Sequence, residues 1–91
     1  MASYLVSYDQ HRDRDYTPIW TALRSNGAVR ILESVWLLDI SNTASEIRDW
    51  LRKTTRDEDS LVVVELKAGS GWATYNVQAD GLTWLRQKVL A

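Results

Sequence analysis

The apolar stretch from Ala28 to Ile40 constrains the fold of this chain more than any other segment. It is rich in Val, Ile and Leu and is interrupted by Arg30 and by the polar pair Glu33-Ser34. Val and Ile favour strands, and a polar pair inside an apolar run is typical of a tight turn. The stretch is also shorter than the ~20 apolar residues that span a bilayer. We therefore predict two strands joined by a turn near Glu33-Ser34.

Before this stretch, the pattern predicts one strand and one helix. Residues 3–9 alternate in type and predict a strand that ends at Asp9, with three residues on one side: Tyr4, Val6 and Tyr8. Thr17 is a good capping residue and Pro18 suits the first helical position, so we expect a helix to begin there. Asn26-Gly27 ends this helix, whose buried face holds Ile19, Ala22 and Leu23.

After the stretch, the pattern predicts a second helix and a fourth strand. Thr43 and Glu46 have the spacing of a capping box. A helix over residues 43–55 would place its apolar residues on one face: Ala44, Ile47 and Leu51. A polar connection follows at residues 56–60, and residues 61–66 then predict a nearly unbroken apolar strand.

The last part of the chain, residues 66–91, predicts a C-terminal extension. A break at Gly69-Ser70-Gly71 precedes a short extra strand over residues 72–77 and a last helix over residues 80–90, with three residues inward: Leu82, Leu85 and Val89. The break lacks the lysine pattern of a P-loop and the G-x-G-x-x-G spacing, so a nucleotide cofactor is not supported. The chain of 91 residues has room for one domain, residues 1–91.

This order of elements, β-α-β-β-α-β followed by the extension, predicts an α+β fold of the ferredoxin-like type. Such a fold has an antiparallel sheet with two helices on one face, and its fourth strand lies at a sheet edge. An apolar edge strand with unpaired backbone groups promotes association unless something covers it. Either the C-terminal extension or a second subunit must do so. We therefore expect a homodimer, with the extension packing on or across it.

Composition excludes several classes of function. The chain has no cysteine, so it forms neither a disulfide nor a thiolate metal site. Eleven basic residues against twelve acidic ones give a net charge of -1, so any contact with nucleic acid must be local. The first ten residues, MASYLVSYDQ, lack the basic start and apolar run of a secretory signal. We expect a cytoplasmic protein without a membrane partner.

Asp9 is the leading candidate for chemistry. It ends the first predicted strand and precedes a charged loop, residues 11–15. A carboxylate in that place can hold Mg²⁺, or Mn²⁺ instead, with substrate phosphate and water completing the coordination. In a dimer, two Asp9 side chains could share one ion. The alternative is that Asp9 caps the following turn.

Residues around this loop are candidates for contact with nucleic acid. Arg12 and Arg14 belong to the loop, and three aromatic residues flank it: Tyr8, Tyr16 and Trp20. Tyr and Trp beside Arg can stack on bases, and packing in the core is the other role open to them. His11 could shuttle protons near neutral pH or be a solvated loop residue. Trp36 and Trp84 lie inside apolar stretches and are expected to be structural.

Arginines elsewhere in the chain could contact phosphate. Arg30 lies in a predicted strand, where a guanidinium needs a partner: Glu33, Asp9 or a phosphate. On the second predicted helix, arginines recur every four residues and form a basic stripe of Arg48, Arg52 and Arg56. The stripe could follow a phosphate backbone, or it could remain solvated, because acidic residues on the same helix partly neutralise it.

Five separated segments carry a resemblance to a known family. In chain order they are Tyr4 to Asp9, Asp15-Tyr16, Leu32 to Leu37, Ser45 to Arg48 and Trp84-Leu85. Together they resemble the small SinR-like proteins, which are related to the second CRISPR-associated adaptation protein (Cas-two) and to VapD-type ribonuclease toxins. The resemblance spans nearly the whole chain. It implies a ferredoxin-like fold and a homodimer.

The resemblance also implies site residues. In the nuclease members of this family a strand-end Asp binds the metal, and Asp9 matches it. Arg30, Ser34 and Val35 match a segment of the form Arg-x-x-x-Ser-Val, in which Arg30 would hold phosphate and Ser34 would support the scissile group. The loop after Asp9 departs from the basic, asparagine- or proline-containing pattern of the family. The near-neutral charge departs from that of the family's integration scaffold, which must bind a long duplex.

Three functions are compatible with these observations. The first is a dimeric Mg²⁺-dependent endonuclease that cleaves RNA or DNA, with paired Asp9 side chains on the metal. The second is a non-catalytic dimeric module that binds nucleic acid or a protein, in which Asp9 is structural. The third is a small regulatory or phage counter-defence protein that binds a nucleotide or a host factor.

Overall fold

The structure, a computed structural model, describes residues 2–9 and 15–89. These residues form a small α+β fold with a four-stranded antiparallel sheet and three helices, as the sequence predicts for the fold class. The elements in chain order are β1 (Ala2–Asp9), α1 (Thr17–Ser25), β2 (Val29–Leu32), β3 (Val35–Ile40), α2 (Ala44–Arg52), β4 (Ser60–Leu66) and α3 (Ala79–Lys88).

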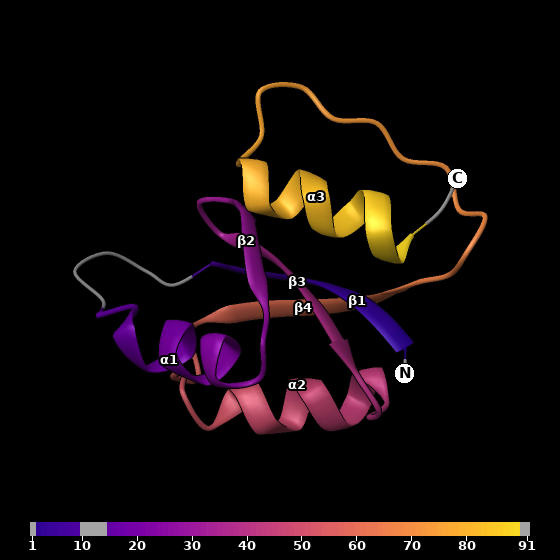
Figure 1. The fold of residues 1–91 in the computed structure, drawn as a ribbon. Coiled ribbons are helices and arrows are strands. Elements are labelled where there is room, and N and C mark those ends of the chain that lie inside the picture. The colour runs from indigo at the N-terminus through magenta and orange to yellow at the C-terminus, as the bar shows by residue number, and fades with distance from the viewer. Residues whose placement is uncertain (1, 10–14, 90–91) are drawn as a thin grey trace.

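The sheet has the strand order β2-β3-β1-β4, so that β1 lies in the centre and β4 at an edge. Each neighbouring pair is antiparallel, and the register places Val6 opposite Trp36 on β3 and opposite Val63 on β4. Helices α1 and α2 cover one face of the sheet, whereas α3 lies on the other (Figure 1). The predicted split of residues 28–40 into two strands is confirmed, with the turn at Glu33-Ser34.

The larger core lies between the sheet and the first two helices. Alternate β1 residues, predicted to share one side, are all buried there: Tyr4, Val6 and Tyr8. Ile19 and Leu23 of α1 and Ile47 and Leu51 of α2 close this core, because their helical spacing puts them on the inner face of each helix. Each such side chain contributes about 1.5–3 kcal/mol when it leaves water.

A second, smaller core lies beneath α3. Trp84 and Leu85 of α3 pack with Leu37, Ile31 and Val89, which confirms the structural role predicted for Trp84. The helix can approach β2 closely because residue 81 is a glycine. A Cβ atom there would lie 2.7 Å from the Cα of Ile31, well inside van der Waals contact.

The predicted strand over residues 72–77 is wrong, because this segment forms no strand. Trp72 bonds to the end of α3 instead, because its indole Nε1 donates to the Val89 carbonyl at 2.6 Å. Directly after the segment, the N–H of Gln78 donates to the Ile31 carbonyl of β2 at 3.0 Å. With those partners the segment is an irregular strap over the second core.

Two predicted helix boundaries also need correction. Tyr16, not Thr17, is the N-cap of α1, and the Asp15 carboxylate accepts the Thr17 N–H at 2.9 Å. Helix α2 ends at Arg52 rather than Thr55, because the N–H groups of residues 53–55 donate to carbonyls three residues back instead of four. The predicted capping box of α2 is confirmed in both directions.

The edge strand β4 presents apolar side chains outward. Val62 and Val64 are 49% and 47% exposed, on the sheet face that carries α3 over β2 and β3. In the described ranges β4 pairs with β1 alone, so its outer backbone edge is open. Among the same residues no helix combines the length and apolarity needed to cross a membrane.

Candidate functional site

Asp9 lies at the end of β1 in a shallow hollow of about 190 Å³ between β1 and β4. Its Cα is paired in register with that of Ser60, and the hollow is also lined by Ser7 and Val62. Because side chains alternate along a strand, Asp9 shares a face with Ser7, the face opposite α1 and α2. The carboxylate therefore lies near Val62, one of the two exposed valines of β4.

Asp9 is exposed and makes no ion pair or hydrogen bond with residues 2–9 or 15–89. A carboxylate that is not neutralised by a neighbouring cation is available to bind one. No group of three or more His, Cys, Asp or Glu residues with metal-ligand geometry occurs in these ranges. Whether Asp9 caps the next turn concerns residues outside the described ranges.

Ser34 lies at the same end of the sheet as Asp9. It belongs to the β2–β3 turn, is half-buried, and its carbonyl accepts the Tyr8 N–H at 3.4 Å. This contact places Ser34 next to the residue that precedes Asp9 in β1. The turn and the strand end therefore form one rim of the sheet.

The hydroxyl of Tyr8 organises a cluster of aromatic side chains on the helical face of this rim. It accepts a hydrogen bond from the Trp20 Nε1 at 2.6 Å and another from the Trp36 Nε1 at 3.1 Å. Tyr16 stacks on Trp20 with ring centroids 5.6 Å apart and planes 12° apart. Tyr8 and Trp36 are buried, so the direct ligand contact predicted for Tyr8 is replaced by a structural role.

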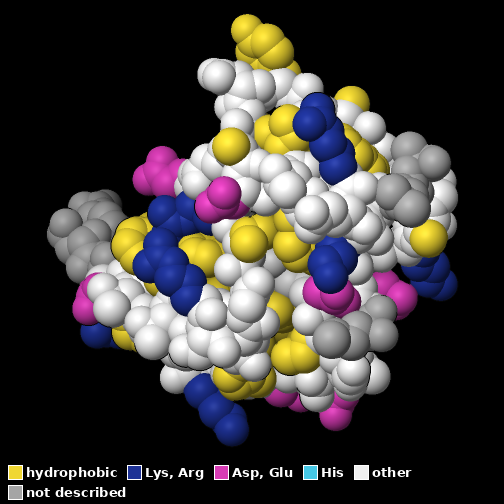
Figure 2. Space-filling view, in the orientation of Figure 1, with side chains coloured by type: hydrophobic (Ala, Val, Ile, Leu, Met, Phe, Trp, Pro, Cys, Tyr) yellow, Lys and Arg dark blue, Asp and Glu magenta, His cyan; other side chains and the backbone are white. Residues whose placement is uncertain are grey.

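Two arginines lie over the rings of this cluster. The guanidinium carbon of Arg30 is 4.4 Å from the Trp20 centroid and 4.7 Å from that of Trp36, and the guanidinium carbon of Arg24 is 5.3 Å from Trp36. Figure 2 shows dark blue basic side chains against yellow hydrophobic ones in the region of α1, β2 and α3. Stacking on indoles stabilises a guanidinium while leaving its charge uncompensated.

Arg30 makes neither of the carboxylate contacts considered for it. Within the described ranges no ion pair joins it to Glu33 or Asp9, and its Nε and Nη2 atoms are buried without an acceptor. It also lies on the other face of the sheet from Asp9, because it pairs with Trp36 on the helical side. A single phosphate group that contacted both Arg30 and a metal ion on Asp9 of the same subunit would therefore have to reach across the sheet.

No known protein-family model matches this chain.

The remaining predicted nucleic-acid residues are dispersed. Arg48 pairs with Asp49 at 3.0 Å and Arg52 with Asp57 at 3.6 Å, so two members of the predicted basic stripe are partly neutralised at the surface. Arg56 is exposed but lies beyond the end of α2, and therefore does not continue the helical stripe. The loop residues His11, Arg12 and Arg14 lie outside the described ranges.

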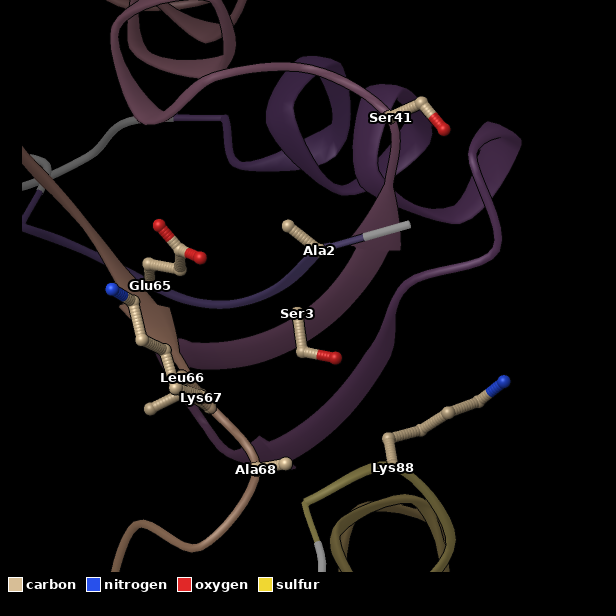
Figure 3. Close-up of a pocket in the computed structure, with 8 residues that line it drawn as sticks. All are labelled: Ala2, Ser3, Ser41, Glu65, Leu66, Lys67, Ala68 and Lys88. Atoms are coloured by element: carbon tan, nitrogen blue, oxygen red, sulfur yellow. The ribbon is translucent and has the colours of Figure 1, made fainter.

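Another hollow lies away from these residues. It has a volume of about 530 Å³ and is lined by Ser3, Ser41, Glu65 and Lys67, among others (Figure 3). It lies at the start of β1, whereas Asp9 lies at its end. Lys88 at its border is paired with Asp39 at 3.2 Å. None of the predicted site residues lines this hollow.

The structure adds residues that the sequence did not suggest. Arg24 joins Arg30 over Trp36, and Gln78 and Asp80 at the start of α3 line the same pocket. The spacing of Trp20 and Arg24, four residues apart on one helix, is a local signal that could have indicated their contact. The approach of α3 to β2 has no such signal, because the two elements are far apart in the chain.

Proposed function

We propose that this chain is a dimeric, metal-dependent endonuclease of ferredoxin-like fold that cleaves phosphodiester bonds in RNA or DNA. The observation that carries the proposal is Asp9, an exposed carboxylate at a strand end with no partner in the described ranges. The ferredoxin-like assignment is supported by the β1-α1-β2-β3-α2-β4 order and by β1 lying between β3 and β4. Helix α3 is an addition to that pattern.

A second copy of the chain would cover the open side of β4. Val62 and Val64 leave an apolar surface next to an unpaired backbone edge, which is the kind of strand that natural proteins cover. These valines share a face with Asp9. Packing of two such faces would bury the valines and bring the two Asp9 carboxylates toward one another, which one subunit cannot do.

In this dimer the two Asp9 side chains would hold Mg²⁺ or Mn²⁺. When bound, such an ion would supply Lewis-acid stabilisation of the phosphate and a more acidic water. Ser34, at the same rim, would support the scissile group. Arg30 would hold phosphate on the helical side of the rim, where stacking on Trp20 and Trp36 fixes its guanidinium before the substrate arrives.

The test is cleavage of labelled single- and double-stranded RNA and DNA, with Mg²⁺, with Mn²⁺ and with chelator. Asp9→Asn should abolish metal-dependent cleavage while the dimer persists. Glu65→Gln is the matched control, since it removes an exposed carboxylate from the far end of the neighbouring strand and should leave cleavage unchanged. Undiminished cleavage by Asp9→Asn would exclude Asp9 as the metal ligand.

A second candidate function is a non-catalytic module that binds nucleic acid. Arg24 and Arg30 favour it, because neither forms an ion pair with a carboxylate in the described ranges. A folded wild-type dimer that binds oligonucleotides without cleaving them would support this function. The surface of Arg48, Arg52 and Arg56 can be tested by replacing all three with Gln. If it takes part, the dependence of binding affinity on salt concentration should fall by about one phosphate contact per arginine removed.

A further inference from the structure

An apolar hollow lies beneath the strap, beside the second core. It has a volume of about 210 Å³, and its walls come from the strap, from α3 and from the neighbouring face of the sheet. Every lining residue except Thr74 has an apolar side chain. The apolar hollow shares no lining residue with the Asp9 hollow or with the pocket of Arg24 and Arg30. It is therefore separate from the proposed nuclease site.

The strap that forms one wall of the apolar hollow is tied down at both ends. At its start, the Trp72 indole Nε1 donates to the Val89 carbonyl at 2.6 Å. Directly after it, the N–H of Gln78 donates to the Ile31 carbonyl at 3.0 Å. These two bonds hold the strap at a fixed distance from the sheet, so the space beneath it exists before any ligand binds. The first bond also fixes the ring of Trp72 as an aromatic wall.

The apolar hollow is buried on one side and open on the other. Among its lining residues, Leu37 and Leu85 are buried. Leu32, in contrast, is 47% exposed, and Ala73 and Thr74 of the strap are exposed as well. A small molecule can therefore enter from the exposed side without unfolding the strap, and it then contacts the buried leucines.

The size and lining of the apolar hollow select its occupant. A water molecule inside a protein needs about two to four polar partners, and the lining side chains offer one hydroxyl group, that of Thr74. A dry apolar cavity of about 150 Å³ binds benzene, whereas pockets for drug-sized ligands measure about 300–1,000 Å³. A hollow of about 210 Å³ lies between these sizes and fits a molecule of one or two fused rings.

We propose that the apolar hollow binds a small aromatic molecule of one or two rings, of the size of indole. The fixed ring of Trp72 gives such a molecule an aromatic contact, and the surrounding Leu, Ile and Val side chains remove its surface from water. A single hydroxyl or N–H group on the ligand would face the open side, where Thr74 lies. This binding is independent of metal, of nucleic acid and of the proposed nuclease activity.

The test is thermal unfolding of the wild-type protein by scanning calorimetry, with and without indole. A ligand this small is expected to bind with a Kd of about 0.1–1 mM. At ten times the Kd, indole should raise the folding equilibrium constant about elevenfold and the Tm by several degrees. Leu5→Trp, which adds an indole ring to a wall of the apolar hollow, should abolish this shift. Leu82→Trp makes the same change on α3 outside the hollow and should retain it.

Methyl NMR of the wild type locates the ligand without any substitution. The methyl groups that indole shifts should be those of Leu37, Val77 and Leu85, which line the apolar hollow. Those of Val62 and Val64, exposed on the same sheet face, should stay in place. Phenol should bind more tightly than cyclohexanol, its saturated counterpart. No rise in Tm at about 10 mM indole, shifts centred on Val62 and Val64, or equal affinity for phenol and cyclohexanol would overturn the proposal.

Discussion

Replacing Tyr8 by Phe tests whether its hydroxyl holds the aromatic cluster together. The change keeps the ring and removes the acceptor used by Trp20 and Trp36. The Trp36 indole is 1% exposed, so its N–H would lose its partner where water cannot replace it, at a cost of about 1–3 kcal/mol. Trp20 is half-buried, and the loss of its hydrogen bond adds roughly 0.5–1.5 kcal/mol to that cost. We expect the free energy of unfolding to fall by about 2–4 kcal/mol.

Thermal and urea unfolding of Tyr8→Phe measure this loss. A domain of this size loses about 4–8 °C of Tm for each kcal/mol, so the effect is easily resolved. Tyr4→Phe is the matched control, four residues earlier on the same face of β1. Its hydroxyl donates to the carbonyl of Asn42 at 2.6 Å, and water can serve that carbonyl because Asn42 is exposed. Equal losses in the two variants, or none in Tyr8→Phe, would refute the reasoning.

Three further predictions concern pH, packing and assembly. Hydrogen bonds from Thr43 lower the pKa of Glu46, so its contribution to stability is complete above the ordinary glutamate pKa of about 4.3 and is lost as the pH falls through the lowered value. Between pH 6 and 2, the Tm of the wild type should fall more steeply with falling pH than the Tm of Glu46→Gln. Parallel plots of Tm against pH would contradict this. Gly81→Ala should destabilise by about 1–3 kcal/mol in urea, because the new methyl group meets Ile31, and an unchanged midpoint would show that α3 can move away. Val62→Lys should shift the protein toward monomer in analytical ultracentrifugation, whereas an unaltered dimer would place the interface elsewhere.

The sequence predicts most elements of this fold because their signals are local. The capping box of α2 depends on two residues three positions apart, and the alternation in β1 reports directly on which side chains are buried. Residues 72–77 show the limit of such signals. A strand requires a neighbouring strand, whereas Trp72 bonds to the end of α3 and Gln78, directly after the segment, bonds to β2.

The candidate site is less predictable because it depends on contacts across the sheet. The sequence identifies Asp9 from its place at a strand end, and the structure places it there. It does not indicate that Arg30 faces away from Asp9, since that follows from the register of β2 on β3. Arg24 and Asp80 come together only when α1 and α3 both approach β2.

The most direct measurement of the central claim is a calorimetric titration of the dimer with Mn²⁺, with Asp9→Asn and Glu65→Gln titrated alongside. Paired Asp9 carboxylates predict one ion for each dimer in wild type and in Glu65→Gln, and no such binding in Asp9→Asn. Binding of one ion for each subunit, or binding that Asp9→Asn leaves unchanged, would contradict a shared metal at Asp9.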